Sequence, residues 1–222
     1  YTTLPISLFM KKLHLRKAFY YYRQFILFSI LGIALNQGCF LMGLKYTSPT
    51  NSALINTLIP VFTILLVAIR GQETVSPLRA IGFCCAFVGV LIVHKPENFR
   101  FSDQTFLGDL LTLVNTFSYS LFLAFCHRFL EKMDFVWATT WLFVYGSLGL
   151  FIFSIPEWNM FSWPSLTPQL WATMIISVLL GSILPYLLIS FTLGRASSST
   201  VALFVYIQPL IASIMSFFFL NE

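Results

Sequence analysis

The sequence predicts an all-α fold: a polytopic membrane helical bundle built from two inverted five-helix repeats. Three observations predict it, namely the composition, the lengths of the apolar stretches, and a pattern of residues that recurs at a fixed distance. Of the 222 residues, 58% are hydrophobic and 9% are charged, whereas soluble domains are about a quarter charged. So few charged residues cannot cover a globule in water. Lipid is therefore the expected solvent for most of the chain.

Seven apolar stretches are long enough, or nearly so, to cross a bilayer as a helix, which takes about 20 residues. The third is short, and we expect it to borrow residues from its flanks. An eighth stretch, Leu4–Met10, is interpreted as the end of a helix whose start is missing. The stretches are continuously apolar, unlike the alternating strands of a membrane barrel. The seven are Phe25–Leu44, Asn51–Ile69, Leu78–Val93, Leu107–Phe125, Trp137–Ile155, Leu170–Leu193 and Thr200–Leu220.

The basic residues predict which loops face the cytoplasm. Ten of the 13 fall in alternate loops, and only Lys45, Lys95 and Arg100 fall in the loops between them. By the positive-inside rule, the loop 11–23 is cytoplasmic. The same residues form no basic stripe or base-reading motif, so no nucleic-acid partner is expected. The ten are Lys11, Lys12, Arg16, Lys17, Arg23, Arg70, Arg79, Arg128, Lys132 and Arg195.

Small residues, prolines and a glutamate recur at a distance of 149 residues. With Pro60 placed on Pro209, eight of 42 positions are identical without a gap. The matches comprise a mid-span glycine, a turn of small residues, a mid-helix proline and a glutamate at a helix end. The other identical pairs are Gly32 and Gly181, Leu35 and Leu184, Leu44 and Leu193, Ser48 and Ser197, Ala53 and Ala202, Leu54 and Leu203, and Glu73 and Glu222.

Five spans separate each position from its copy, and because five is odd, the two copies cross the membrane in opposite directions. Inverted repeats of this kind are common in secondary transporters. The distance of 149 residues predicts ten helices in the complete protein, of which this chain holds about seven and a stub. The expected domains are 1–93, a first repeat truncated at its N-terminus, and 107–222, a second repeat that lacks its last helix.

At these residues the sequence resembles the EamA family of the drug/metabolite transporter superfamily. The resemblance implies a ten-helix inverted-repeat carrier with a central cavity, both termini in the cytoplasm and no cofactor. It also implies export or exchange of small metabolites such as amino acids. The second copy departs from the pattern, since Gly194 and Arg195 stand where the first has Lys45 and Tyr46. The residues that carry the resemblance are Gly43–Pro49, Ala53, Leu54, Pro60, Glu73 and Leu78–Val93 in the first copy, and Ala196–Ser199, Ala202, Leu203, Pro209 and Glu222 in the second.

Polar side chains inside the spans are the candidate substrate-binding residues, because a polar group in lipid is costly unless it faces protein or water. One reading is a hydrogen-bonding lining for an uncharged or zwitterionic solute. The other is hydrogen bonding between helices that stabilises the bundle. Three prolines, Pro60, Pro185 and Pro209, are candidate helix kinks, since each removes a backbone donor. The candidate lining residues are Asn36, Gln37, Asn56, Asn115, Tyr119, Tyr186, Tyr206 and Gln208.

Two other classes of protein compete with a transporter. An intramembrane enzyme needs a nucleophile and base or metal ligands at mid-depth, and the spans contain no HExxH, no GxSxG and no deep pair of Asp or His. We therefore expect no catalytic residues and no metal site. A seven-helix receptor has no need of two antiparallel copies. The expected partners are a small-molecule substrate, the lipid bilayer and, as a homodimer, a second copy. The expected location is a bacterial inner (plasma) membrane.

Overall fold

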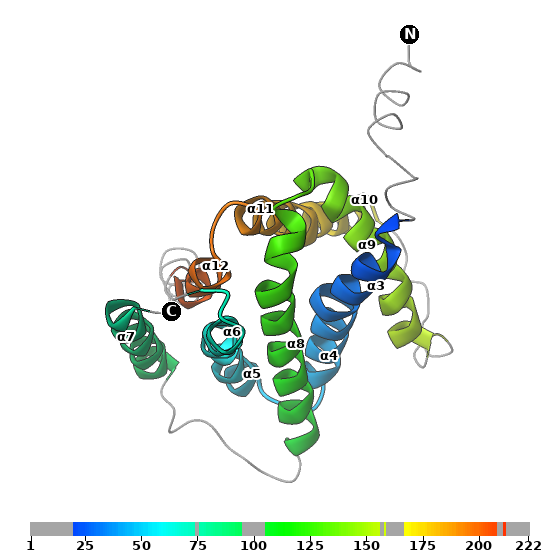
Figure 1. Ribbon diagram of the computed structural model, residues 1–222. Coiled ribbons are helices and arrows are strands. Elements are labelled where there is room, and N and C mark those ends of the chain that lie inside the picture. The colour runs from blue at the N-terminus through cyan, green and yellow to red at the C-terminus, as the bar shows by residue number, and fades with distance from the viewer. Residues whose placement is uncertain are drawn as a thin grey trace.

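The computed structural model describes residues 20–73, 76–94, 105–155, 158, 167–207 and 211. Its regular elements are helical, and they gather around the long helix α8 (Figure 1). The stub Leu4–Met10 and most of the 11–23 loop lie outside the described residues, as do Gln208, Pro209 and Glu222. In chain order the helices are α3 (Tyr22–Ser29), α4 (Leu35–Leu44), α5 (Pro49–Asn56), α6 (Leu58–Ile69), α7 (Pro77–His94), α8 (Phe106–Leu130), α9 (Phe135–Ser154), α10 (Pro168–Val178), α11 (Leu184–Leu193) and α12 (Ser198–Leu203).

The prediction of a polytopic helical bundle is confirmed. Five helices, some running through more than one labelled element, are long and apolar enough to cross a bilayer, and each coincides with a predicted span. The short third stretch is α7, which takes in Pro77 and His94 from its flanks. The seventh begins at α12, and its remainder lies largely beyond the described residues. The five are Tyr22–Leu44, Asn51–Ile69, Phe106–Leu130, Phe135–Ser154 and Pro168–Leu193.

Helix α8 packs closely against α4 because glycine allows the two backbones to approach. A Cβ added at Gly108 would lie 2.5 Å from the backbone nitrogen of Thr47 and 2.8 Å from the carbonyl oxygen of Gly43. At Gly43 an added Cβ would lie 2.9 Å from the hydroxyl of Thr112. Small residues at such crossings are typical of membrane bundles, in which packing rather than water exclusion drives association.

Structural interruptions recur at the same distance of 149 residues as the sequence matches. Between α3 and α4 the chain forms a π turn, Ile30–Ala34, and between α10 and α11 a second one, Leu179–Ile183. These turns are 149 residues apart. Pro185 follows only the second turn, so proline is not their shared cause, whereas each turn has a glycine at its third residue. The caps also match, because the Ser48 and Ser197 side chains accept hydrogen bonds from the third residue of the helix that follows.

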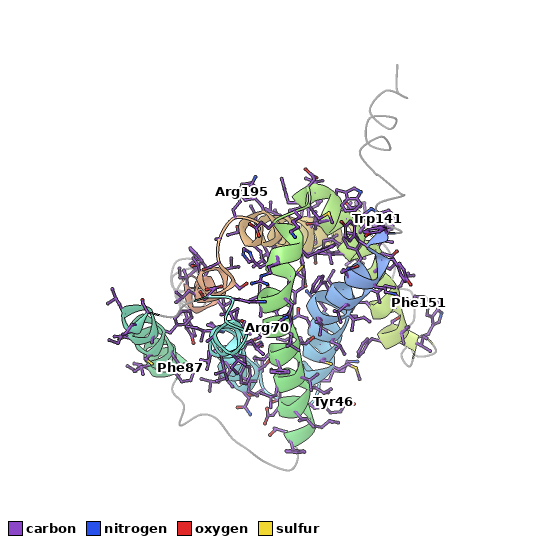
Figure 2. All side chains as sticks on the ribbon, in the orientation of Figure 1. Tyr46, Arg70, Phe87, Trp141, Phe151 and Arg195 are labelled. Atoms are coloured by element: carbon purple, nitrogen blue, oxygen red, sulfur yellow. The ribbon has the colours of Figure 1, made fainter. Side chains whose placement is uncertain are left out.

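The turn before α5 and the turn before α12 lie at opposite ends of α8. The first contacts Gly108, near the start of α8, while the second lies beside Leu130, its last residue. Gly108 and Leu130 are 22 residues apart on α8, so at a rise of about 1.5 Å per residue the helix separates the two turns by about 33 Å. Figure 2 shows the labelled residues of these turns, Tyr46 and Arg195, toward opposite ends of this helix.

Described parts of all four predicted cytoplasmic segments meet at the C-terminal end of α8. The ring of Tyr21 lies 5.9 Å from that of Phe129, and the guanidinium of Arg70 lies 4.2 Å from the Phe125 ring centroid. The ring nitrogen Nδ1 of His127 lies 2.5 Å from the carbonyl oxygen of Leu193. The segments that carry most of the basic residues are therefore together at one end of the bundle.

Candidate functional site

Three asparagines from three helices form one hydrogen-bonded cluster. Asn36 of α4 donates from Nδ2 to Oδ1 of Asn115 on α8, at 2.6 Å. Asn115 in turn donates from Nδ2 to Oδ1 of Asn56, the last residue of α5, at 2.9 Å. The Thr116 hydroxyl donates to the same Asn56 oxygen at 2.8 Å. Asn115 is 2% exposed, so the cluster satisfies an amide that would otherwise be costly inside the bundle.

Tyr186 of α11 joins this cluster to the π turn Ile30–Ala34. The Tyr186 hydroxyl donates to the carbonyl oxygen of Gly32 at 2.6 Å, and it lies 3.5 Å from Oδ1 of Asn36. It also accepts a long hydrogen bond of 3.4 Å from Nε2 of Gln37. A π turn disturbs the regular helical ladder and is often found at functional sites. Here its glycine carbonyl binds a side chain from a helix far along the chain.

These groups surround a cavity of about 340 Å³, which is at the small end of the range for small-molecule sites. Asn115 lies nine residues after the start of α8, about 13 Å along it, so the cavity lies near the middle of this helix. Six of the eight candidate lining residues line it. The lining consists of Asn36, Gln37, Phe40, Asn56, Ile59, Asn115, Tyr119, Gly181, Pro185, Tyr186, Ile189 and Val205.

All eight lining residues from α4, α5, α11 and the segment after α12 fall into four pairs separated by 149 residues. Gln37 and Tyr186 are one such pair, and they are hydrogen-bonded to each other. In the predicted repeat arrangement, positions 149 residues apart are copies of each other, so the cavity would lie where the two copies meet. The other three pairs are Asn36 and Pro185, Phe40 and Ile189, and Asn56 and Val205.

One described candidate, Tyr206, is not among the residues that line this cavity. It lies in a short 3-10 turn, Phe204–Tyr206, after α12. Its ring packs against Phe83 and Phe87 of α7, with ring centroids 6.5 Å apart for Phe87. Gln208 lies outside the described residues. A role of either residue in substrate binding stays a prediction.

Two of the three prolines predicted to kink helices, Pro60 and Pro185, lie in the described part of the chain, and both are close to a break between helical elements. The boundary between α5 and α6 falls at Thr57, three residues before Pro60, and the Thr57 backbone stays in the right-handed helical region at φ −65° and ψ −14°. Pro185 directly follows the first residue of α11, just after the π turn. Pro209 lies outside the described residues. Both described interruptions adjoin the cavity, since Asn56 and Pro185 line it.

Several lining residues carry no polar signal in the sequence. Phe40, Ile59, Ile189 and Val205 look like any other apolar residue of a span. The distance of 149 residues was the signal that could have found two of them, because it places Val205 on the candidate Asn56 and Ile59 on the candidate Gln208. Thr116 was also missed, although it follows Asn115 directly and donates to the same cluster.

The Glu73 carboxylate joins the end of α6 to the start of α12, near the C-terminal end of α8. Gly71, at a φ of 59°, ends α6, and glycine adopts this left-handed conformation without steric cost. Two residues later, Glu73 accepts hydrogen bonds from the backbone nitrogen of Ser199, at 3.3 Å, and from its hydroxyl. Ser199 lies in the first turn of α12, where unpaired N–H groups favour negative charge. Glu73 thus connects the end of α6 to the start of α12.

Another carboxylate is buried at the opposite end. Asp109, in the first turn of α8, is 4% exposed. Its Oδ1 accepts hydrogen bonds from the Thr47 hydroxyl at 2.5 Å and from Nδ2 of Asn51 at 3.3 Å. It therefore fixes the turn before α5 to α8. Asp109 does not line the cavity, whose described lining contains no Asp, Glu, His, Lys or Arg.

Known transporters resemble this chain over most of its length. It is 30% identical over 196 residues to an "Uncharacterized transporter" of Archaeoglobus fulgidus, covering 87% of this chain and 66% of that protein. It is 28% identical over 210 residues to the "Uncharacterized transporter YyaM" of Bacillus subtilis, covering 94% and 68%. The chain thus spans about two thirds of the length of these relatives.

A solved crystal structure has the same fold. It superposes with a TM-score of 0.70 at 16% identity, covering 86% of this chain and 66% of that one. The sequence profile of the EamA-like transporter family matches residues 2–94 and 106–222. Since the two matched segments together cover most of the chain, it belongs to the EamA-like transporter family.

Proposed function

We propose that this chain forms part of a membrane carrier that moves a small metabolite across the bilayer by alternating access. The observation that carries the proposal is the cavity near the middle of α8, which is lined by paired positions from both copies. A site at the junction of two repeats is open to either side when one repeat rocks against the other. The transporter names of the relatives support the same class of function.

The carrier consists of two inverted repeats, 1–93 and 107–222, in the part that this chain contains. The π turns and the serine caps, each pair 149 residues apart, support two copies of one unit. The position of the two matching turns at opposite ends of α8 supports their opposite orientation. On this proposal Asn36, Gln37, Asn56, Asn115, Tyr119 and Tyr186 bind the solute.

We place the carrier in a bacterial inner membrane, with the loop 11–23 in the cytoplasm and the direction of transport as export or exchange. The gathering of basic segments at one end of the bundle supports this orientation. Amino acids are the substrates that the family resemblance implies, and a homodimer is the assembly that we expect. The protein acts as a carrier, with no catalytic step.

Transport is tested with the complete protein that contains this chain, reconstituted into proteoliposomes. We expect saturable uptake of at least one small metabolite from a panel of amino acids, their derivatives and uncharged drugs, and competition by excess unlabelled solute. Empty liposomes are the control. No flux above that control across the whole panel would count against a carrier.

Orientation is tested by cysteine labelling from each side of the membrane, after replacement of the four native cysteines. We expect Arg195→Cys to react with an impermeant maleimide only from the cytoplasmic side, and Tyr46→Cys only from the other side. Both residues are exposed, so a failure to react does not follow from burial. Reaction of both from one side would refute the inverted arrangement.

A further inference from the structure

The cavity described above adjoins a second, apolar one. We call the first the amide chamber, since Asn36, Asn56 and Asn115 form its polar wall. The second, the apolar chamber, has a volume of about 220 Å³ and lies between α8, α11 and α12. The two chambers share four lining residues, so they adjoin along a common wall. These are Ile59, Tyr119, Ile189 and Val205.

The apolar chamber offers a solute almost nothing but hydrocarbon. The residues that belong to it alone are Leu123, Leu188, Thr192, Val201 and Phe204. The one hydroxyl among them, that of Thr192, already donates to the carbonyl oxygen of Leu188 at 2.7 Å. A tail placed here would leave water for an apolar surface, which is favourable roughly in proportion to the area buried.

The amide chamber has hydrogen-bonding capacity to spare. In the described part of the chain, Oδ1 of Asn56 accepts two hydrogen bonds while its Nδ2 donates none. The Gln37 side chain donates one long bond, and its Oε1 accepts none from a described residue. An amide nitrogen has two donors and an amide oxygen two acceptor sites. A complementary head group would therefore both accept and donate.

The described lining of the same chamber contains no charged side chain. Its described lining consists of amides, two phenols, one proline and apolar residues. A carboxylate or ammonium group removed from water without a partner of opposite charge carries a large desolvation penalty. A zwitterion would bring two such groups into a site that pairs neither, so the described lining favours an uncharged head.

We propose that the two chambers together bind an uncharged amphipathic solute, with a carboxamide-like head in the amide chamber and a small hydrocarbon tail in the apolar chamber. The inference rests on the proposed carrier function and narrows its substrate class. The polar wall comes from the first copy and α8, whereas the paired positions Pro185, Ile189 and Val205 of the second copy are apolar. The solute therefore lies with its head toward α4 and α5 and its tail toward α11 and α12.

Three probes separate the contributions of head and tail: N-acetyl-leucinamide, leucine and N-acetyl-glycinamide. Leucine keeps the tail but has a zwitterionic head, and N-acetyl-glycinamide keeps the uncharged head but has no tail. Binding to the complete purified protein is measured by titration calorimetry. We expect N-acetyl-leucinamide to bind at least about tenfold more tightly than either of the other probes. N-acetyl-glycinamide binds more weakly because it lacks the aliphatic tail that would be buried, and leucine binds more weakly because its two charges have no partners in the site.

Two variants test the tail chamber. Val201→Phe fills it and Leu188→Ala removes part of its wall, so each should weaken N-acetyl-leucinamide binding by about tenfold. Neither should change the binding of N-acetyl-glycinamide, and that unchanged binding shows that the variant is folded. Equal loss for both probes, or no loss for either, would overturn the assignment of the tail.

The outcomes separate this inference from the proposed function. Tighter binding of leucine than of N-acetyl-leucinamide would overturn the assignment of an uncharged head group. Such a site should bind its solute with a Kd of about 1 mM or better. If none of the three probes bound at about 10 mM, the whole inference would be overturned. If leucine were transported in proteoliposomes, the proposed carrier function would stand after either of these two results. Tight binding of N-acetyl-leucinamide in a protein that moves no solute would support the inference and contradict the carrier.

Discussion

Asn115→Leu should reduce transport at least about 100-fold, the largest functional effect that we expect of any single substitution. Leucine has a similar volume but cannot accept from Asn36 or donate to Asn56, and these bonds are 2.6 and 2.9 Å long. Each buried amide left unpaired costs about 1–3 kcal/mol. The variant should therefore lose both the polar wall of the cavity and some stability. Uptake into proteoliposomes is the measurement, scaled to the folded protein present.

Two control variants distinguish loss of the site from loss of the fold. Thr140→Val changes a hydroxyl on the exposed face of α9 that bonds only within its own helix, so both stability and uptake should stay near wild type. Gln37→Met removes a cavity amide whose only described bond is 3.4 Å long, so uptake should fall about tenfold with stability nearly unchanged. If Asn115→Leu kept more than half of the wild-type uptake, the amide cluster would not be the binding site.

Gly108→Ala should destabilise the protein by about 2 kcal/mol, although alanine favours helix more than glycine does. The added Cβ would lie 2.5 Å from the Thr47 backbone nitrogen and 2.7 Å from the Tyr46 carbonyl carbon. Backbone atoms cannot rotate away as a side chain can, so α8 must move from the turn before α5. Overpacking of this kind costs about 1–3 kcal/mol, sometimes more. Detergent-induced unfolding of the complete protein measures the change.

Gly82→Ala is the matched control, because it makes the same chemical change at a helical position without close neighbours. No described atom lies within 4 Å of a Cβ added there. Its stability should therefore rise, by up to about 1 kcal/mol, through helix propensity alone. Equal effects of the two substitutions would mean that the close approach of α4 and α8 contributes nothing to stability.

The membrane helices could be predicted from the sequence because lipid imposes a simple requirement on the backbone. In hydrocarbon every N–H and C=O must be paired within the segment, so a long apolar stretch has to be a helix. Tyr22–Leu44 and Phe106–Leu130 extend the predicted stretches by only a few residues. The extensions include polar residues such as Tyr22 and His127, which hydropathy alone excludes but helix geometry accepts.

The cavity was only partly predictable, for a different physical reason. A polar residue in lipid needs a partner, so Asn36, Asn56 and Asn115 could be selected, and the structure brings them together. An apolar residue is equally stable facing lipid, a neighbouring helix or a cavity, so hydropathy does not distinguish Phe40 or Ile189. Tyr206 packs against α7 from a 3-10 turn, and such a turn has no clear sequence signature.

The hydrogen bond between Gln37 and Tyr186 has a consequence for how such a protein arises. In the proposed repeat arrangement, Gln37 and Tyr186 are equivalent positions that meet on the axis relating the two repeats. In a dimer of two identical subunits, the same position of each subunit would meet there, so glutamine would face glutamine or tyrosine would face tyrosine. Joining both copies in one chain lets each side of the axis change separately, which allows an amide of one half to donate to a phenol of the other. Gene fusion would thus give a symmetric scaffold an asymmetric binding site while both halves retain the same fold.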